Sequence, residues 1–423
     1  MTHLRLKLAI LLSYAIFAVL LNSVGTVILQ SIEYFRVGKV SASTLEGFKD
    51  LTIAVVSFVV ASALPRIGYR RSMMIGLGSV GVACLMMPIA NAFWMTRLLF
   101  MATGFGFALT KVSVYSFVGL LTDSPRSHAS LLNVIEGVFM LGVLGGYWLF
   151  SGFIEAGNPA SASWLSVYWY LAAACAVAVA LLAITRFDES AAHADGTASS
   201  LRGDFAAMLA LVVRPLTLVF ILSVFLYVLV EQGIGSWLPT FNRELLGLSA
   251  PMSVQAASIF ACGLAVGRLA AGAIVRRTGW YRLLLGCFVG MGVLILLALP
   301  LAPAHPGVVD TWAQAPLAAL IFPLIGVIMA PIYPALNSAI LSAMPRSTHA
   351  AMVGLIVVFS ALGGTTGSLI VGRTFAATGG ATAFYLLLVP IAGSIVAIVL
   401  LRRRIEQQAE ERRVADAAQP SMT

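Results

Sequence analysis

About a dozen apolar runs, each long enough to cross a lipid bilayer, constrain this chain more than any other feature of its sequence. A helix needs about 20 apolar residues to span a hydrocarbon core about 30 Å thick. Such runs fill most of the 423 residues, which are 60% hydrophobic and 10% charged. We therefore expect an all-α integral membrane protein with twelve transmembrane helices. The expected helices lie near residues 7–30, 47–64, 72–91, 94–122, 129–153, 164–185, 213–240, 252–275, 281–301, 314–343, 349–375 and 379–401.

A polar stretch at residues 186–204, RFDESAAHADGTASSLRGD, divides the apolar runs into two groups of six. Its small and charged residues bury too little apolar surface to fold alone, which is typical of a linker. The N-terminal apolar stretch has no small-residue cleavage site, so we interpret it as a retained first helix and not as a signal peptide. The expected division is an N-terminal six-helix bundle at 1–185, a cytoplasmic linker at 186–212, a C-terminal six-helix bundle at 213–401 and a cytoplasmic tail at 402–423.

The basic residues predict how the chain sits in the membrane. Of 26 lysines and arginines, about 18 fall on one side of the expected spans, about six fall on the other, and Lys111 and Arg268 lie within helices. Cytoplasmic loops carry such an excess, so we expect both termini in the cytoplasm and the protein in an inner membrane. The net charge of +9 is then explained without nucleic-acid binding. Asp50 and Arg97 fall near the expected periplasmic helix ends, where we expect their side chains to reach water.

Two short segments recur in the same order in both halves of the chain. The loop ASALPRIGYRR at 61–71 is echoed by GAIVRRTGWYR at 272–282, and SPRSHAS at 124–130 is echoed by MPRSTHA at 344–350. A repeat on this scale is typical of transporters built from two related halves. We therefore expect two pseudo-symmetric bundles.

One of these loops resembles the signature of the major facilitator superfamily. The segment GRLAAGAIVRRTG at 267–279 has the signature's glycines and basic residues, and the first-half copy is a weaker version. The acidic residue of the signature is replaced by Pro65 and Arg276, which argues against an Asp-mediated gating interaction in this loop. The resemblance implies a major facilitator fold. The loop and gating residues that it suggests are Gly68, Arg70, Arg71, Arg268, Gly272, Arg277 and Gly279.

Three further segments resemble the fucose-galactose-hexose symporter branch of that superfamily. They are LLNVIEGVFMLG at 131–142, FLYVLVEQGIGSWLPTF at 225–241 and APIYPALNSAI at 330–340. That branch carries an Asn-Asp pair late in its first helix, where this chain has LLNSVGTVILQ at 20–30. The proton-carrying Asp of the branch therefore has no counterpart in that helix.

Ionisable residues within apolar runs point to function, because a charge inside the bilayer is costly. Lys111 and Glu136 fall on consecutive antiparallel helices at similar depth, and we expect them to form a buried ion pair near mid-membrane. One interpretation is that the pair only fixes helix packing. The other is that Lys111 binds an anionic or hydroxyl-rich solute while Glu136 releases Lys111 or carries a proton.

Glu231 is the third such residue, beside Gln232 and the GIG sequence of 233–235. Glycines at this point would allow the helix to break and close over a solute. We expect Glu231 to line the pathway, with an already hydrated acid at the periplasmic mouth as the alternative. Arg268 we interpret as a structural residue at the cytoplasmic interface between helices, outside the cavity.

Several uncharged side chains fit the needs of a hydroxylated solute, which takes hydrogen bonds and packs on ring faces. Tyr115 shares a helix face with Lys111, and Asn133 lies one turn before Glu136. The full set of such residues is Asn22, Tyr115, Asn133, Tyr227, Trp237, Tyr333 and Asn337. Each alone is an ordinary helix-packing residue, and only their convergence favours a binding site.

No phosphate-binding loop, HExxH or GxSxG motif is present in the sequence, and no histidine or cysteine spacing predicts a metal ligand. We therefore expect a carrier without cofactor, with a membrane-embedded enzyme or receptor as alternatives of another class. The expected partners are a small solute, protons as the coupling ion and membrane lipid, and the expected state is a monomer. The glycines of 137–146 come without the Gly-Pro pair of many exporters, which favours uptake over proton-antiport efflux. Lys111 points to a sugar acid or other organic anion, whereas the resemblance points to a neutral sugar.

Overall fold

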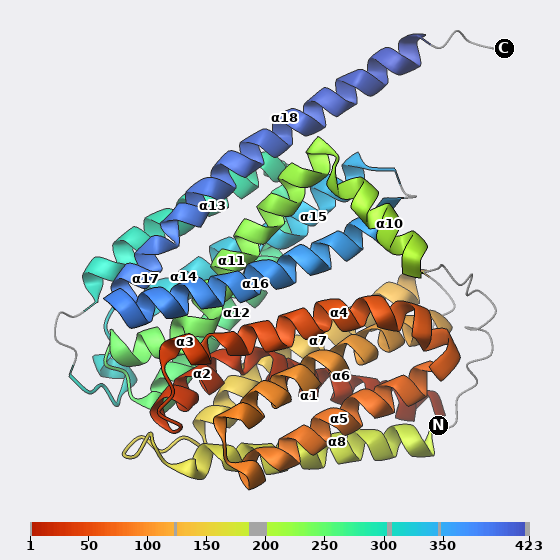
Figure 1. Ribbon diagram of the computed structural model, residues 1–423. Coiled ribbons are helices and arrows are strands. Elements are labelled where there is room, and N and C mark those ends of the chain that lie inside the picture. Colours follow the sequence, from red (N-terminus) through yellow and green to blue (C-terminus); the bar gives the residue numbers. More distant parts are fainter. Residues whose placement is uncertain (1, 122–124, 186–200, 303–306, 346–347, 419–423) are drawn as a thin grey trace.

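The computed structural model describes residues 2–121, 125–185, 201–302, 307–345 and 348–418, and long helices make up nearly all of them (Figure 1). The N-terminal bundle consists of helices from the first 184 residues. They are α1 (Thr2–Asn22), α2 (Val24–Glu33), α3 (Lys39–Ala42), α4 (Thr44–Ile67), α5 (Tyr69–Ala90), α6 (Phe93–Leu120), α7 (Pro125–Ser151), the short η1 (Ala162–Ser166) and α8 (Val167–Ile184).

The C-terminal bundle repeats this arrangement, and α10 (Leu201–Val212) precedes it. Its elements are α11 (Pro215–Glu244), α12 (Ala250–Thr278), α13 (Trp280–Ala298), η2 (Leu299–Leu301), η3 (Trp312–Gln314), α14 (Ala318–Met329), α15 (Ile332–Ala343), α16 (His349–Thr378), α17 (Gly380–Leu386) and α18 (Leu388–Ala418). Figure 1 shows the two bundles side by side, the first coloured red to yellow and the second green to blue.

Eleven segments of the described chain are long and apolar enough to cross a membrane. The helix α4, which carries three charged residues in its first two turns, is not among them, yet it packs between α6 and α16 as the second helix of the expected order. The predicted all-α membrane fold with two six-helix bundles is confirmed.

Three helices predicted as continuous are broken in the structure. The first ends at Asn22 and resumes at Val24, because the Ser23 hydroxyl donates to the Leu20 carbonyl, 2.8 Å away, in competition with the helical ladder. The tenth breaks before Pro331, which has no N–H to donate. The twelfth is divided at Leu387 into α17 and α18.

Two glycines of the predicted loop signature set the turns between neighbouring helices. Gly68 joins α4 to α5 with a φ of 89°, and Gly279 joins α12 to α13 with a φ of 74°. Residues with a Cβ rarely adopt this left-handed region. Glycine at these two repeated positions lets each helix turn back at once, which keeps the pairs α4–α5 and α12–α13 adjacent.

The molecule has two ends, which we name by what lies there. The linker end holds the start of α1, the end of α8 and the helix α10, and the loop end holds α2, α3 and α17 (Figure 1). The second part of the expected linker at 186–212 is helical. Residues 201–212 form α10, because Met208 and Leu211 bury their side chains and the helix packs on α16.

Candidate functional site

Polar contacts join the two bundles at the loop end. Lys39 pairs with Glu244 at 2.9 Å, and Arg243 pairs with Glu33 at 3.3 Å. Nearby, Gln255 at the start of α12 donates to the Ser151 hydroxyl at 3.3 Å. A second layer lies deeper: the Trp237 ring nitrogen donates to the Ser368 carbonyl at 3.0 Å, and the Ser368 hydroxyl donates to the Ser43 carbonyl at 3.2 Å. The bundles are therefore held together at this end by contacts on several helices.

Three charged residues of α4 lie inside this interface, and we call Glu46, Lys49 and Asp50 the α4 triad. Lys49 forms an ion pair with Glu46, and its Nζ lies 3.4 Å from Asp50 Oδ1. Glu46 is 0% exposed, Lys49 is 5% exposed, and the Asp50 side chain is 12% exposed. The spacing of three and four residues places all three on one face of α4.

The face of the α4 triad turns toward the C-terminal bundle. The Ser236 hydroxyl of α11 donates to Glu46 Oε2 at 2.7 Å. On α16, a Cβ added to Gly364 would lie 2.6 Å from Asp50 Oδ2 and 3.1 Å from the Gln232 side chain, so Asp50 and Gln232 pack against the same point of that helix. The expectation that Asp50 reaches water at a helix end is wrong, because a facing bundle covers it.

Lys111, Tyr115 and Glu136 form a second polar group on α6 and α7, closer to the linker end. Tyr115 donates to Glu136 Oε1 over a long 3.4 Å, and Lys111 Nζ lies 5.7 Å from the centre of the Phe107 ring. All three side chains are exposed. The predicted buried Lys111–Glu136 ion pair is wrong in this structure, since no N–O distance of 4.0 Å or less joins the two residues. The α6 and α7 helices contact each other little, so Lys111 and Glu136 interact only over a longer range.

The exposed face of α6 points into the molecule and not toward lipid. Phe107, one turn before Lys111, packs against Tyr14 and Phe17 of α1 and against Phe139 of α7. Residues four apart share a helix face, so Lys111 faces the same interior region. Exposure there means that water reaches the interior of the bundle.

The C-terminal bundle contributes its own charged pair. Glu231 of α11 lies with Oε1 3.9 Å from Nη2 of Arg268 on α12, and the Arg268 side chain is 47% exposed. Arg268 was interpreted above as a structural residue outside the cavity, and its long side chain reaches Glu231, the residue predicted to line the pathway. Around this pair, the rings of Tyr227 and Tyr333 lie 6.2 Å apart, and Tyr333 is 3.3 Å from the Ser360 hydroxyl.

Helix register places Glu136 and Arg268 at the same depth. Val143 of α7 and Ala261 of α12 lie in one small buried cluster where the bundles meet. Glu136 and Arg268 each lie seven residues from that contact toward the linker end, two turns or about 10 Å, on the same helix face. We call Lys111, Glu136, Glu231 and Arg268 the central tetrad. Each bundle thus contributes one acid and one base to this group.

The uncharged residues of the predicted site fall into two groups. Tyr333, Asn337, Tyr115 and Asn133 keep some exposure, and the Asn337 side-chain oxygen has no hydrogen-bond donor. The others are occupied. Tyr227 and Trp237 are 0% exposed and donate to backbone carbonyls of Met329 and Ser368, and Asn22 donates to Ala18 of its own helix.

The glycines of the GIG sequence do not break helix α11, which runs without interruption from Pro215 to Glu244. They allow close packing instead. A Cβ at Gly233 would lie 3.2 Å from the Leu387 and Val371 side chains, and a Cβ at Gly25 of α2 would lie 3.0 Å from the Gly235 carbonyl. The predicted helix break at this point is therefore wrong for this structure.

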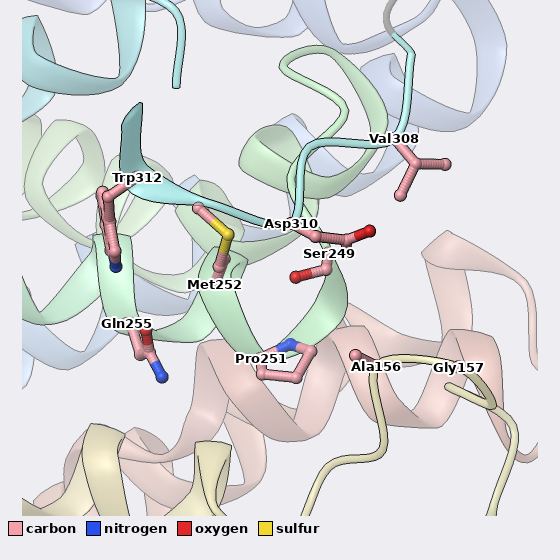
Figure 2. Close-up of a pocket in the computed structure, with 9 residues that line it drawn as sticks. All are labelled: Ala156, Gly157, Ser249, Pro251, Met252, Gln255, Val308, Asp310 and Trp312. Carbon is pink, nitrogen blue, oxygen red and sulfur yellow. The ribbon is translucent and has the colours of Figure 1, made fainter. Parts of the chain in front are cut away.

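A separate open pocket of about 540 Å³ lies at the loop end (Figure 2). Gln255, Met252 and Ser249 of the α12 start face Asp310 and Trp312, while Ala156 and Gly157 of the N-terminal bundle close one side. It shares no residue with the central tetrad. It lies where the two bundles are already in contact, outside the charged centre.

Comparison with known families now gives this geometry a context. Residues 8–368 match the Major Facilitator Superfamily. The chain belongs to the Major Facilitator Superfamily. This is a superfamily of transporters, so the chain is a transporter and not an enzyme. No curated protein matches the chain significantly.

Solved structures show the same major facilitator fold at low sequence identity. The nucleoside transporter NupG matches with a TM-score of 0.70 and 14% identity, over 95% of this chain and 98% of that one. A bacterial homologue of the human lysosomal transporter Spinster, inward-facing and unoccupied, matches at 0.72 and 12%, over 97% of both chains. FucP in the outward conformation matches at 0.59 and 15%, over 96% of this chain and 99% of FucP.

The loop-signature residues of this Major Facilitator Superfamily member lie at the linker end. Arg70 donates to the Thr185 carbonyl at 2.8 Å and so ties α5 to the end of α8. Arg71, Gly272 and Arg277 are exposed, and a Cβ at Gly272 would meet nothing within 4 Å. Of the predicted loop and gating residues, Arg268 belongs to the central tetrad, whereas Arg70, Arg71, Gly272 and Arg277 lie closer to the linker end.

The α4 triad is the part of the site that the sequence interpretation missed. The predicted second helix began at residue 47, so Glu46 fell outside it and Lys49 was counted among loop charges. The structure extends the helix back to Thr44. The sequence did carry one indication of a charged helix face. Glu46, Lys49 and Asp50 follow one another as acid, base and acid, three residues and one residue apart, just inside an apolar run.

Proposed function

We propose that this protein is a secondary active transporter that takes up a small hydroxylated organic anion, such as a sugar acid, together with protons. The observation that carries the proposal is the central tetrad. Four ionisable side chains from both bundles lie at mid-span, on faces turned to the interior, with exposed ammonium and guanidinium groups. Such charges are costly in a membrane unless they serve a solute or an ion.

The chemistry of the tetrad favours an anion over a neutral sugar. In the part of the chain that the structure describes, no carboxylate lies within ion-pair distance of Lys111, and Arg268 has only Glu231 at a long 3.9 Å. Both groups therefore retain donors for a carboxylate, which Arg binds through two parallel hydrogen bonds. The unpaired Asn337 oxygen and the Tyr333 ring nearby suit hydroxyl groups and the apolar face of a sugar ring.

Alternating access follows from the difference between the two ends. The loop end is closed by contacts across the bundles, whereas Lys111, Glu136 and Arg268 of the tetrad are exposed on the linker side of that closure. The excess of basic residues assigns the linker end to the cytoplasm. The structure then corresponds to a carrier open to the cytoplasm, and transport requires the loop-end contacts to break while the linker end closes.

Counterflow in proteoliposomes tests this function with a matched pair of solutes. The purified full-length protein is loaded with D-galacturonate or with D-galactose, which differ in one carboxylate, and exchange of the external radiolabelled solute is measured. We expect exchange of galacturonate well above that of galactose, and loss of the exchange in Arg268→Ala. Exchange of galactose alone would contradict the anion assignment, and exchange of neither solute would contradict the proposed substrate class.

A further inference from the structure

The α4 triad holds two carboxylates and one ammonium in a sealed interface. Glu46 is fully buried and Lys49 nearly so, and both lie between α4 and the C-terminal bundle. One ammonium balances one carboxylate, so the triad retains one unbalanced negative charge. An isolated charge inside a protein is strongly disfavoured, and a carboxylate in that position takes up a proton.

The position of Glu46 and Asp50 beside one ammonium group also favours the binding of one proton. The Glu46 and Asp50 carboxyl groups interact with each other as well as with Lys49. Both carboxyl groups lie against the same ammonium group, so they repel each other when both are ionised, and one shared proton relieves that repulsion. Asp50 Oδ2 lies against the α16 backbone at Gly364, on the side away from the Oδ1 atom that faces Lys49. A proton on Asp50 removes the charge from that contact.

The groups facing the triad from other helices do not supply the missing positive charge. Lys49 Nζ also donates to the Leu21 carbonyl of α1 at 3.4 Å, and Tyr147 of α7 is close enough to interact electrostatically. From α11 come Ser236 and Gln232, which are uncharged. Arg97 of α6 turns away, with its guanidinium 4.8 Å from the Phe93 ring centre and 5.7 Å from that of Phe48.

We propose that Glu46 and Asp50 together form the coupling-proton site of this transporter and that one bound proton allows the loop end to close. The inference rests on the proposed function, which requires a coupling ion. When the bundles separate at the loop end, water hydrates both carboxylates and the proton leaves or enters from that side. When they close, the carboxyl pair retains one proton as a neutral acid beside the Lys49–carboxylate pair.

The same turn of α11 links the proton site to the central tetrad. Gln232, which meets Asp50 at Gly364, directly follows Glu231, which faces Arg268. Asp50 keeps 12% exposure in the closed interface while Glu46 has none. Asp50 is therefore the carboxyl from which the proton reaches the linker end, and Glu46 is the one that meets the loop end first.

Spin-label distances across the loop end test the proton site without any solute. The full-length protein carries labels at Val40→Cys and Leu317→Cys, two exposed positions on different bundles, in a Cys262→Ser background. Distances are measured by double electron–electron resonance in lipid nanodiscs at about pH 5.5 and about pH 8.5, to compare a carboxyl pair that holds a proton with one that has released it. We expect one short distance at low pH and a longer population at high pH.

Variants with a neutral side chain distinguish the pH response of Glu46 and Asp50 from that of other acids at the loop end. Glu46→Gln and Asp50→Asn should each keep the short distance at both pH values, while Asp310→Asn, an exposed acid of the loop end, should respond as the wild type does. Two variants are used because either alone could fail to fold. A wild-type response that persists unchanged in both variants, or no response in the wild type, would overturn the proposal.

Transport measurements distinguish failure of this site from failure of the proposed function. With galacturonate, the wild type should accumulate solute about tenfold for each pH unit of gradient, because one proton moves with each anion. Asp50→Asn should keep counterflow exchange and lose the gradient-driven accumulation. No exchange in the wild type, together with an intact pH response of the labels, would contradict the proposed solute class alone. Full accumulation by Asp50→Asn would contradict the proton site alone.

Discussion

The α4 triad and the central tetrad contain the same kinds of side chain in opposite settings. In the triad, a lysine and two acids lie in contact beneath the facing bundle, and Ser236 completes the hydrogen bonding of Glu46. In the tetrad, Lys111, Glu136 and Arg268 are exposed, Glu231 is 19% exposed, and the ion pair between Glu231 and Arg268 is 3.9 Å long. Charges that are buried and paired hold two surfaces together, whereas charges left exposed and loosely paired remain available to a ligand.

The difference also explains how the helices can hold the seven charged groups of the triad and the tetrad. Burial of a charge is tolerated when a partner and hydrogen bonds compensate its lost hydration. The triad meets that condition only while the bundles are closed at the loop end. In the tetrad, water hydrates the charged groups and so supplies that compensation. A bound anion would replace that water.

The largest effect should come from removing the base of the triad. Lys49→Met keeps the length of the side chain but leaves two carboxylates buried together, at a cost of about 3–5 kcal/mol in the free energy of unfolding. Lys111→Met, the same change in the tetrad, should stay within about 0.5 kcal/mol. Thermal unfolding of both variants in one detergent measures the contrast. Equal unfolding temperatures would show that Lys49 is not buried in the way described.

Arg268→Ala should weaken binding of galacturonate by about 10- to 150-fold, because hydrogen bonds to a charged group contribute about 1.5–3 kcal/mol. Arg268→Lys keeps the charge without the paired donors and should recover only part of the loss. The control is Arg276→Ala, an exposed arginine on the same helix. Affinity from isothermal titration decides the outcome, and equal losses in Arg268→Ala and Arg276→Ala would remove Arg268 from the site.

A smaller effect should follow from filling the contact between Asp50 and α16. An alanine Cβ at Gly364 would lie 2.6 Å from Asp50 Oδ2, and the resulting shift should cost about 1–3 kcal/mol. Gly286→Ala on α13 meets nothing within 4 Å and should stabilise the helix by about 0.5–1 kcal/mol. Thermal unfolding of the two variants should thus move in opposite directions. A stabilised Gly364→Ala would mean that the close approach is not maintained.

The smallest effect concerns the outer ion pairs of the loop end. Lys39 and Glu244 are 22% and 36% exposed, and such a pair contributes about 0.2–1 kcal/mol. Lys39→Met should therefore lower the unfolding temperature far less than Lys49→Met, and the difference from wild type should shrink further in high salt. A loss as large as that of Lys49→Met would place the main closure of the loop end in the outer layer.

The helices and their order could be predicted from the sequence, because an apolar run of this length identifies a membrane-spanning helix without information from the rest of the chain. The turns at Gly68 and Gly279 were also predicted, from the repeated signature. The break at Ser23 was not, since it depends on a side-chain hydrogen bond within an otherwise uniform apolar run.

The candidate site was predicted only in part, for a related reason. Lys111, Glu136 and Glu231 stand out because they interrupt apolar runs. The contact of Arg268 with Glu231 was not predicted, because a backbone position near the signature does not reveal how far the side chain extends. The burial of Glu46 depends on Ser236, which is 190 residues away in the chain, and no local pattern shows that contact.

The most direct test of the account is the accessibility of the central space from each side of the membrane. Asn133→Cys, an exposed position one turn before Glu136, is introduced in a Cys262→Ser background and treated with a membrane-impermeant maleimide. With the orientation that the basic residues predict, inside-out vesicles present the linker end and intact cells present the loop end. We predict faster labelling in the inside-out vesicles, slowed by D-galacturonate and unaffected by D-galactose. Equal labelling from both sides, or labelling that galacturonate does not slow, would contradict a solute site between the bundles that opens at the linker end.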